Sequence, residues 1–586
     1  MTSSSVYSNS RYLRIKDDVL TGLLTGLIMG FIDTYGYCVT GYTTSEISLI
    51  IMPVIVYSFF RLLRLRPSTL DIFVASVIAF GISLTSAITS GMYVTYTLLN
   101  NLPITKKLGI ELPTWLYFSE EGNYLPQSII NYSLMTLISA SGIVLAYIFY
   151  RHFIDRERLL YPIGVSSAFM INTITLKTVK TLLVPFLIGF ITELAALLWG
   201  PFTYDLTPSL QPIVPGMALS LGIDFFMLYL ALIMPLNTSL GICLGNALMY
   251  LLIFPILAFQ GLLLISANTS MTTLVVSSTP YLSSFIVGFI LLSIMWYLLS
   301  NYRSYAKTLR ILLSYRINRL LMMVSLALLT LQIVTAIVYD NKLLNLVFLP
   351  IFVATIVMQV VLTLVNMRVV GEVGLGSQAI FPIATSLIYV SGYKGASLYV
   401  FADPFTGIPM PQYFAGSAMN VIKIGRVLEL DIETVVLLLL LGILVGAPIT
   451  LIYGHLLLAV YGLHSRYFSL VRWLPLTYWM VALYGRAVGE VFNVSVIAMG
   501  VTVSIMLIAL LRALRLTQIS LFAILIGLTL IPDLFLTFLI ASLIKYVTMR
   551  LGAEIQESLI TSSALALAGA GTAVILHTLM LISMGG

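Results

Sequence analysis

Charged residues are scarce in this chain. Asp, Glu, Lys and Arg make up 9% of its 586 residues, whereas 59% are hydrophobic. A soluble domain is about one quarter charged, so the composition excludes a soluble globular protein. Apolar runs recur along the whole length, which also excludes a soluble domain with a single membrane anchor. The two cysteines, Cys38 and Cys243, both fall in apolar segments, so they indicate neither a disulfide framework nor a metal motif.

Nucleotide-binding and catalytic motifs are also missing. The pattern Gly-x-x-x-x-Gly-Lys-[Ser/Thr] does not occur, so coupling to nucleotide hydrolysis is not supported in this chain. A membrane-embedded protease or lipid-linked transferase would need a catalytic set, and Gly-x-Ser-x-Gly, His-Glu-x-x-His and Asp-x-x-Asp are absent. The four histidines lack metal-binding spacing. We therefore expect no enzyme, no cofactor and no metal site. A passive channel stays an alternative, although no repeated filter loop is present.

Sixteen apolar segments are candidates for membrane helices, because a span needs about 20 predominantly apolar residues. The first eight lie near 18–40, 45–62, 70–99, 128–150, 181–200, 214–234, 237–265 and 281–300. The second eight lie near 319–339, 342–366, 379–402, 434–460, 475–492, 494–512, 518–545 and 560–582. Backbone in a membrane must satisfy its own hydrogen bonds. We therefore predict an all-α polytopic membrane protein of about 16 transmembrane helices with re-entrant or broken segments.

The basic residues predict the division of the chain and its orientation. The net charge is +7, and we assign it to cytoplasmic loops and not to nucleic-acid binding. We predict a cytoplasmic N-terminal segment 1–17, an eight-helix half 18–300, a basic cytoplasmic connection 301–318 and a second eight-helix half 319–586. The even helix count places both termini in the cytoplasm of a cell-membrane protein. Halves with an even number of helices would be parallel repeats about an axis along the membrane normal.

The segment 155–180 interrupts the pattern. Its apolar centre, 159–176, is barely long enough for a span, and Arg158 and Lys177 flank it. A crossing would place positive charge on both sides of the membrane. We therefore predict that 159–176 enters and returns, with Lys177 on the same side as Arg158. The alternative is an amphipathic helix on the membrane surface.

Motifs in the first half resemble those of the oligopeptide transporter (OPT) superfamily. In the interrupting segment, an aromatic-Pro-x-Gly run with small residues after it is similar to the family's Phe-Pro-x-Gly-x-Ala signature, through Tyr161, Pro162, Gly164 and Ala168. The first two spans are similar to the family's opening pair of helices, through Gly26, Gly30, Tyr35, Gly36, Gly41 and Pro53.

Motifs in the second half follow in the family's order. An Arg-x-x-Gly-x-x-Gly stretch with a later Pro is matched by Arg368, Gly371, Gly374, Gln378 and Pro382. Near the end, Gly527 and Pro532 match the closing helix, while Asp533 replaces the family's second Pro. The resemblance runs from about residue 18 to 580, as in a divergent member. It implies a sixteen-helix secondary transporter, usually a proton-coupled symporter, for short peptides, glutathione-like thiols or metal complexes of amino-acid-derived chelators.

Charged and polar groups inside the spans are the candidates for substrate binding and proton coupling. A charge within a span costs about 3 kcal/mol on insertion scales, so each one suggests a function. The candidates are Asp33, Tyr35, Glu193, Asp224, Lys394, Arg486 and Asp533. Asp533 comes first, because the preceding Pro532 should break its helix and place an acid at the break.

Three of these candidates have alternatives or specific placements. Asp33 could instead lie near the outer interface. Lys394 is expected at mid-membrane in the span 379–402. Arg486 and Glu490 are four residues apart, so on one helix they would share a face and form an ion pair; the alternative is a contact between Arg486 and a substrate carboxylate.

The leading hypothesis is a proton-coupled symporter of short oligopeptides or peptide-like solutes. The alternative is uptake of metal–chelate complexes by the same fold, in which the protein binds the carboxylates of the chelator and not the ion, because no Met, Cys or His cluster lines a span. The expected partners are membrane lipid, protons and the small peptide or metal–chelate substrate. Assembly of the chain into a homo-oligomer is a further possibility that the sequence leaves open.

Overall fold

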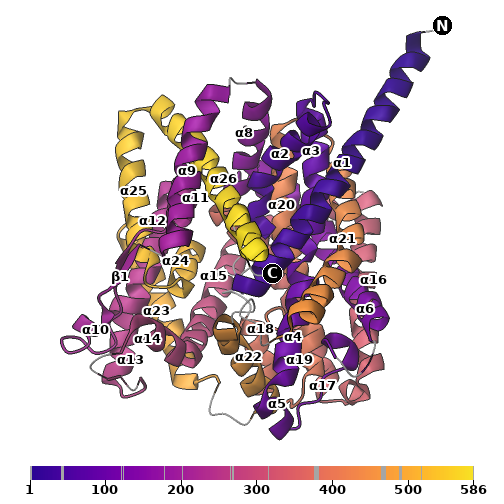
Figure 1. Cartoon of the computed structure of the whole chain (residues 1–586). Coiled ribbons are helices and arrows are strands. Elements are labelled where there is room, and N and C mark those ends of the chain that lie inside the picture. The colour runs from indigo at the N-terminus through magenta and orange to yellow at the C-terminus, as the bar shows by residue number, and fades with distance from the viewer. Residues whose placement is uncertain are drawn as a thin grey trace.

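The chain is mostly helical in the computed structural model (Figure 1). The structure describes residues 3–40, 45–119, 122, 124–176, 179–200, 202–263, 265–266, 269–314, 316–374, 376, 382–463, 470–486, 491–516 and 518–584. Within them, two short strands, β1 (Thr203–Asp205) and β2 (Ser220–Gly222), form an antiparallel pair with Tyr204 opposite Leu221. The protein is therefore an all-α polytopic membrane protein with one small strand pair.

The helices before the centre of the chain are α1 (Ser3–Thr40), α2 (Ser45–Leu62), α3 (Thr69–Thr85), η1 (Ala87–Gly91), α4 (Met92–Asn101), α5 (Pro103–Lys107), η2 (Thr114–Leu116), α6 (Leu125–Ser139), α7 (Ser141–Tyr150), η3 (Arg151–Arg156), α8 (Pro162–Leu176), α9 (Val179–Trp199), α10 (Thr207–Leu210), α11 (Phe225–Ile233), α12 (Leu236–Ala247), η4 (Leu248–Ile253), α13 (Phe254–Phe259), α14 (Met271–Ser277) and α15 (Thr279–Ser314).

The later helices are α16 (Arg316–Tyr339), η5 (Asn341–Leu344), α17 (Phe348–Val373), α18 (Pro382–Val390), α19 (Ser397–Ala402), α20 (Pro411–Val427), α21 (Ile432–Tyr461), α22 (Leu470–Gly485), α23 (Val494–Ala513), α24 (Leu521–Thr529), α25 (Leu534–Leu551) and α26 (Ala553–Met584). The basic connection 301–318 is itself largely helical, because α15 runs to Ser314 and α16 begins at Arg316.

Eleven helical stretches among the described residues are long and apolar enough to cross a membrane, and each falls in one of the sixteen predicted segments. Two further segments, 45–62 and 181–200, hold shorter apolar helices. The remaining three, 214–234, 379–402 and 475–492, hold only short or interrupted helices. The segment 379–402, for example, divides into α18 and α19 around a turn at Gly392 and Gly395, whose φ values of 83° and 124° favour glycine.

Close backbone crossings join helices that are far apart in the sequence. Six glycines form three such crossings, where a Cβ atom would lie only 1.9–2.2 Å from a carbonyl oxygen of the partner helix. In every case that carbonyl belongs to the residue three positions before the partner's glycine. Only glycine permits such contact between membrane helices. The pairs are Gly189 of α9 with Gly569 of α26, Gly288 of α15 with Gly500 of α23, and Gly245 of α12 with Gly527 of α24.

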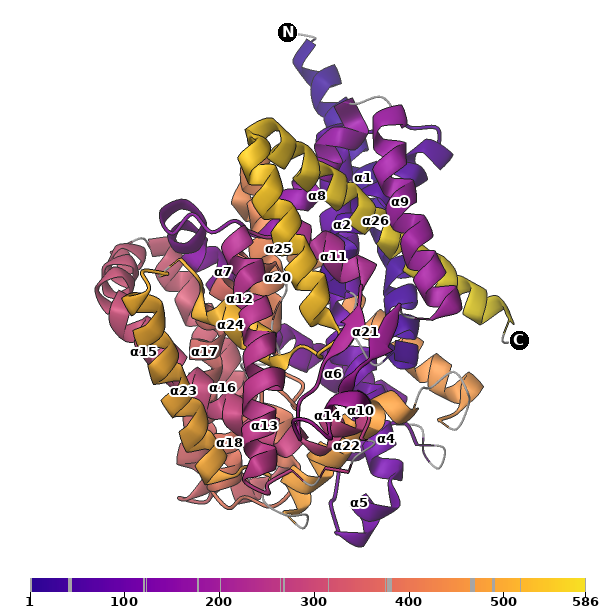
Figure 2. The ribbon, with the colours of Figure 1, turned by 90° about the vertical axis from the view of Figure 1, so that its left-hand side faces the viewer.

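These crossings belong to two sets of four helices that pack in matching pairs. The first set is α9, α11, α12 and α15, and the second is α23, α24, α25 and α26. Taken in chain order, α9 is equivalent to α23, α11 to α24, α12 to α25 and α15 to α26. The contact of α9 with α26 is matched by that of α23 with α15, and the contact of α12 with α24 is matched by that of α25 with α11. Figure 1 shows α9 crossing α26, and Figure 2 shows α15 beside α23 at one edge of the molecule. Helices α11 and α24 both have nine residues, and a proline soon follows each of them.

The equivalent helices α12 and α25 run in opposite directions. Cys243 Sγ of α12 lies 3.9 Å from the carbonyl oxygen of Phe535 at the start of α25, whereas Ser239, earlier in α12, contacts Lys545 farther along α25. Residue numbers along α12 therefore rise in the direction in which those along α25 fall. The two sets form an inverted repeat, with an axis across the helices. The expectation of parallel repeats is wrong for these eight helices, because the predicted span 518–545 contains two helices, α24 and α25, and the parity changes.

The interrupting segment is a buried helix. Helix α8 has fifteen residues and packs against α2 and α20. Its small side chains Ser166, Ser167 and Ala168 are fully buried, and side chains of this size permit close packing between helices. This burial excludes the surface-helix alternative. Lys177, whose side of the membrane was predicted, lies outside the described residues.

Candidate functional site

The end of the nine-residue helix α11 is held by a buried lysine. The Nζ atom of Lys545 on α25 donates to the carbonyl oxygens of Ala231 (2.8 Å), Met234 (2.7 Å) and Pro235 (3.2 Å), and to the hydroxyl of Ser239. The carbonyls at a helix end lack partners within the helix and carry partial negative charge. A cation from the other repeat therefore stabilises this end.

The equivalent end of α24 is held by a neutral amide. The Nδ2 atom of Asn246 on α12 donates to the carbonyl oxygens of Leu530 and Ile531, both at 3.0 Å. Pro532 follows and cannot continue the helical hydrogen bonding, so the predicted break before Asp533 is confirmed. Each repeat thus supplies the donor that holds the broken helix of the other repeat.

The acids Glu193, Asp224 and Asp533 come together near the start of α11. Asp224 is the N-cap of α11 and accepts a hydrogen bond from the amide of Met227 (2.8 Å). The predicted span 214–234 would place Asp224 in the middle of a helix, and this is wrong, because the chain before Asp224 forms strand β2. Glu193 of α9 and Asp533 both lie close enough to Asp224 for their charges to interact. One Asp533 oxygen, Oδ1, is buried without a hydrogen-bond partner among the described residues.

Two of the motifs that resemble the OPT superfamily, the one that begins at Tyr161 and the one that begins at Arg368, contact each other directly although they are far apart in the sequence. The Tyr161 hydroxyl donates to the carbonyl of Met367 (3.0 Å), and its amide donates to the carbonyl of Gly371 (2.9 Å). Tyr161 has φ 53°, a left-handed conformation uncommon for a tyrosine. A Cβ at Gly371 would lie 2.9 Å from Leu159 Cβ, so glycine is needed for this approach.

Asn420 of α20 joins the ends of both motifs. Its Oδ1 accepts from the amide of Gly164 (3.2 Å), and its Nδ2 donates to the carbonyl of Gly374 (2.9 Å). Pro162 and Pro382 are the first residues of α8 and α18, where proline's missing amide costs nothing. Gln378 lies outside the described residues.

Arg368, between these contacts, is the centre of an ion network. It pairs with Glu157 and with Glu372, the latter at 2.9 Å. Glu157 also lies 2.9 Å from His152. The Arg368 guanidinium lies over the ring of Tyr297, 4.6 Å from its centroid. The arrangement joins η3, α15 and α17, and it satisfies the charges of Arg368 within the protein.

Asp33 and Tyr35 lie in the interior of α1. Their exposed fractions are 4% and 2%, so protein encloses both side chains, and the alternative that places Asp33 near the outer interface stays open. The Asp33 carboxylate accepts hydrogen bonds from Ser48 (3.1 Å) and from Ser83. Hydroxyl donors of this kind stabilise a buried carboxylate.

The two candidate cations, Lys394 and Arg486, both lie at helix ends. Lys394 is in the turn between α18 and α19 and is exposed, so it does not lie within a continuous helix, and its position at mid-membrane stays a prediction. Arg486 follows the end of α22 at Gly485, and its guanidinium lies 4.6 Å from the ring centroid of Tyr389. The predicted ion pair between Arg486 and Glu490 stays a prediction. Glu490 itself lies outside the described residues.

The guanidinium of Arg486 lies beside the turn that holds Lys394, because a Cβ at Gly392 would lie 3.4 Å from Arg486 Nη1.

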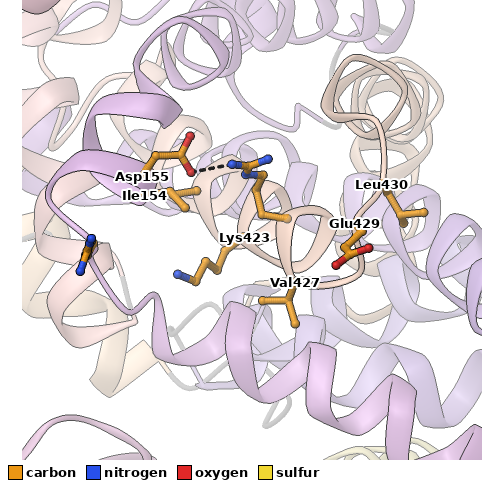
Figure 3. Close-up of a pocket in the computed structure, with 8 residues that line it drawn as sticks. Ile154, Asp155, Lys423, Val427, Glu429 and Leu430 are labelled. Carbon is orange, nitrogen blue, oxygen red and sulfur yellow. Dashed lines mark hydrogen bonds and ion pairs between the residues drawn. The ribbon is translucent and has the colours of Figure 1, made fainter.

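A surface hollow of about 880 Å³ lies where η3 meets the end of α20 (Figure 3). Arg426 and Asp155 form an ion pair across it at 2.9 Å. Lys423 donates to the carbonyl of Leu159 (3.1 Å). Two basic side chains that line the hollow, Arg426 and Lys423, therefore already bind groups of the protein.

Sequence reasoning missed Lys545, Asn246 and Glu157. Lys545 ends the predicted span 518–545, where a lysine is usual at the membrane interface. Asn246 is uncharged, so no insertion cost drew attention to it. Glu157 belonged to a basic loop, and only the fold places it against Arg368.

Comparisons of the chain with known protein families and with curated proteins find no match. The resemblance to the OPT superfamily therefore stays a prediction from the motifs.

Proposed function

We propose that this chain is a secondary active transporter that couples proton movement to uptake of short oligopeptides or peptide-like solutes across the cell membrane. The observation that supports this most is the pair of nine-residue helices, α11 and α24, each ending at a break and held by the opposite inverted repeat. Secondary transporters bind substrates and ions where inverted repeats meet at interrupted helices.

The charged groups support specific roles. A free peptide carries a carboxylate at one end, which Arg486 and Lys394 would bind. The acids Glu193, Asp224 and Asp533 would carry the coupling proton, because a carboxylate away from water is more stable when neutral.

The proposal extends to the topology. The segments 214–234, 379–402 and 475–492 would enter the membrane as interrupted spans and bring the count to sixteen in two halves. The placement of both termini in the cytoplasm stays a prediction from the loop charges. Labelling of single cysteines introduced at Ser5 and Ser583 from each side of sealed vesicles tests it.

Uptake of metal–chelate complexes is the alternative. Such complexes also present carboxylates, so the same cations would bind them. Within the described residues, no group of three His, Cys, Asp or Glu side chains could hold a metal ion, so recognition would act on the chelator.

Uptake by purified protein in proteoliposomes tests these functions. Labelled trialanine, glutathione and an iron complex of an amino-acid-derived chelator are offered with and without a pH gradient. Accumulation of trialanine or glutathione that requires the gradient supports the first function, and accumulation of the iron complex alone supports the alternative. Equilibration of a probe at the same rate with or without the gradient, and no accumulation, would refute coupled transport.

A further inference from the structure

Lys545 is a buried cation with no acidic partner. It is 5% exposed and lies within α25, a helix that is long and apolar enough to cross a membrane. Among the described residues, no carboxylate forms an ion pair with it, and its four contacts are three carbonyl oxygens and one hydroxyl. An unpaired charge at such a place is costly and usually serves a function.

The inverted repeat provides an internal control for the role of this charge. At the equivalent end of α24, the neutral amide of Asn246 binds the free carbonyls. Capping a broken helix in this protein therefore needs hydrogen-bond donors and not a positive charge. The ammonium of Lys545 is surrounded by oxygen atoms at a helix end, as coupling cations are in other transporters.

No hydrogen bond or ion pair joins Lys545 to a charged or titratable group on the surrounding elements within the described residues. Asp224 caps the opposite end of the helix, nine residues away, which is about 13 Å at 1.5 Å per residue. On α25 itself, Asp533 is at the start. The other such groups on α11, α12, η4, α25 and α26 are Tyr229, Cys243, Tyr250, Tyr546, Arg550, Glu554, Glu557 and His577, and none bonds to Lys545.

We propose that Lys545 carries a coupling proton and acts as a switch between the two repeats, an inference that rests on the proposed function. The ammonium has three donors for its four oxygens, so it joins α25 firmly to the end of α11 and to Ser239. When Lys545 gives its proton to water, the neutral amine keeps only two N–H donors and its lone pair faces carbonyl oxygens. The contact weakens, and α25 can move relative to α11. Uptake of a proton from water restores it.

Hydrogen exchange in lipid nanodiscs tests the switch without any substrate. After correction for intrinsic exchange rates, protection at the end of α11 (residues 230–239) should fall at least about tenfold between low and high pH in the wild type. The matched control is the end of α24 (residues 524–531), measured in the Asp533→Asn variant so that this acid does not titrate beside it. Asn246 holds this end, and its protection should show no such change.

Two substitutions separate charge from shape. Lys545→Asn copies the neutral donor of the other repeat and should remove the pH dependence at α11. Lys545→Arg keeps a permanent charge and should retain protection at high pH. Equal pH dependence in the wild type and Lys545→Asn, or none in the wild type, would overturn the inference.

Transport then tests the coupling. A gradient of one pH unit can drive up to about tenfold accumulation for one proton. In Lys545→Asn, accumulation of trialanine should fall to the equilibrium value, while exchange of labelled for unlabelled trialanine continues; wild-type accumulation in this variant would overturn the coupling role. If the wild type transports none of the probes, the proposed function fails, while the hydrogen exchange still decides whether Lys545 is a proton-controlled switch.

Discussion

An alanine at Gly189 should separate α9 from α26 and destabilise the protein. The added Cβ would lie 1.9 Å from the carbonyl oxygen of Ala566, whereas ordinary contact begins at 3.4 Å. The two backbones would have to separate locally by the difference, about 1.5 Å. Because a backbone carbonyl cannot rotate away as a side chain can, the helices themselves must move.

The magnitude follows from two opposing effects. Overpacking costs typically 1–3 kcal/mol, and we expect the upper part of that range here. Replacing a helical glycine with alanine recovers about 0.5–1 kcal/mol. The net loss in the free energy of unfolding should therefore be about 2 kcal/mol. Gly36→Ala is the matched control, since a Cβ at this helical glycine has nothing within 4 Å, and it should be neutral or slightly stabilising.

The assay is the midpoint of SDS-induced unfolding in mixed micelles, followed by circular dichroism. The inverted repeat adds a second requirement, because Gly500 is the counterpart of Gly189. Its Cβ would lie 2.2 Å from the carbonyl of Phe285, so Gly500→Ala should lose a similar amount. The overpacking argument would be refuted if Gly189→Ala were as stable as Gly36→Ala. The equivalence of Gly189 and Gly500 would be refuted if the free energies of unfolding of their alanine variants differed by more than about 2 kcal/mol.

Three further predictions follow from individual contacts. Asp533→Asn should abolish accumulation driven by a pH gradient but preserve substrate exchange, which needs no net proton movement; wild-type accumulation in proteoliposomes would make Asp533 a structural residue at a break. Asp431→Ala removes the N-cap that accepts from the amide of Thr434 (3.0 Å) and should cost about 1 kcal/mol. The Thr434 hydrogen bonds lower the pKa of the Asp431 carboxyl. The cap therefore stabilises the folded protein fully at pH values above the ordinary carboxyl pKa, and this stabilisation is lost as the pH falls through the lowered pKa. Unfolding midpoints should therefore converge for wild type and variant at acid pH, and a constant difference would contradict this. For Arg368→Gln and Glu157→Gln, a double-mutant cycle of unfolding should give a coupling of about 0.5–3 kcal/mol, whereas additive losses would mean that this ion pair contributes little.

The apolar runs, the proline break and the rare charges within spans could be read from the sequence. Apolar length located every one of the eleven long helices, because a membrane selects for such runs. Pro532 marked the break between α24 and α25, since its ring excludes the helical hydrogen bond. The rarity of charge in spans also picked out Glu193, Asp224 and Asp533, and the fold places Glu193 and Asp533 each within electrostatic reach of Asp224.

What the sequence could not provide depends on partners far along the chain. Gly245 is an ordinary glycine until α24 crosses it, nearly three hundred residues later. Lys394 looked buried because apolar residues surround it, but Gly392 and Gly395 turn the chain and expose it. The direction of the repeat depended on whether 518–545 held one helix or two, and hydropathy does not resolve a break of a few apolar residues.

The unequal donors at the two broken ends have a consequence for the resting state. In a perfectly symmetric inverted repeat, exchanging the conformations of the two sets would give the opposite-facing state at the same free energy. Lys545 and Asn246 remove that equality, because a charge holds one end and an amide the other. A charge that moves through the membrane field gains or loses about 2.3 kcal/mol per 100 mV. We therefore expect the membrane potential, and not only the pH gradient, to favour one facing of the protein over the other.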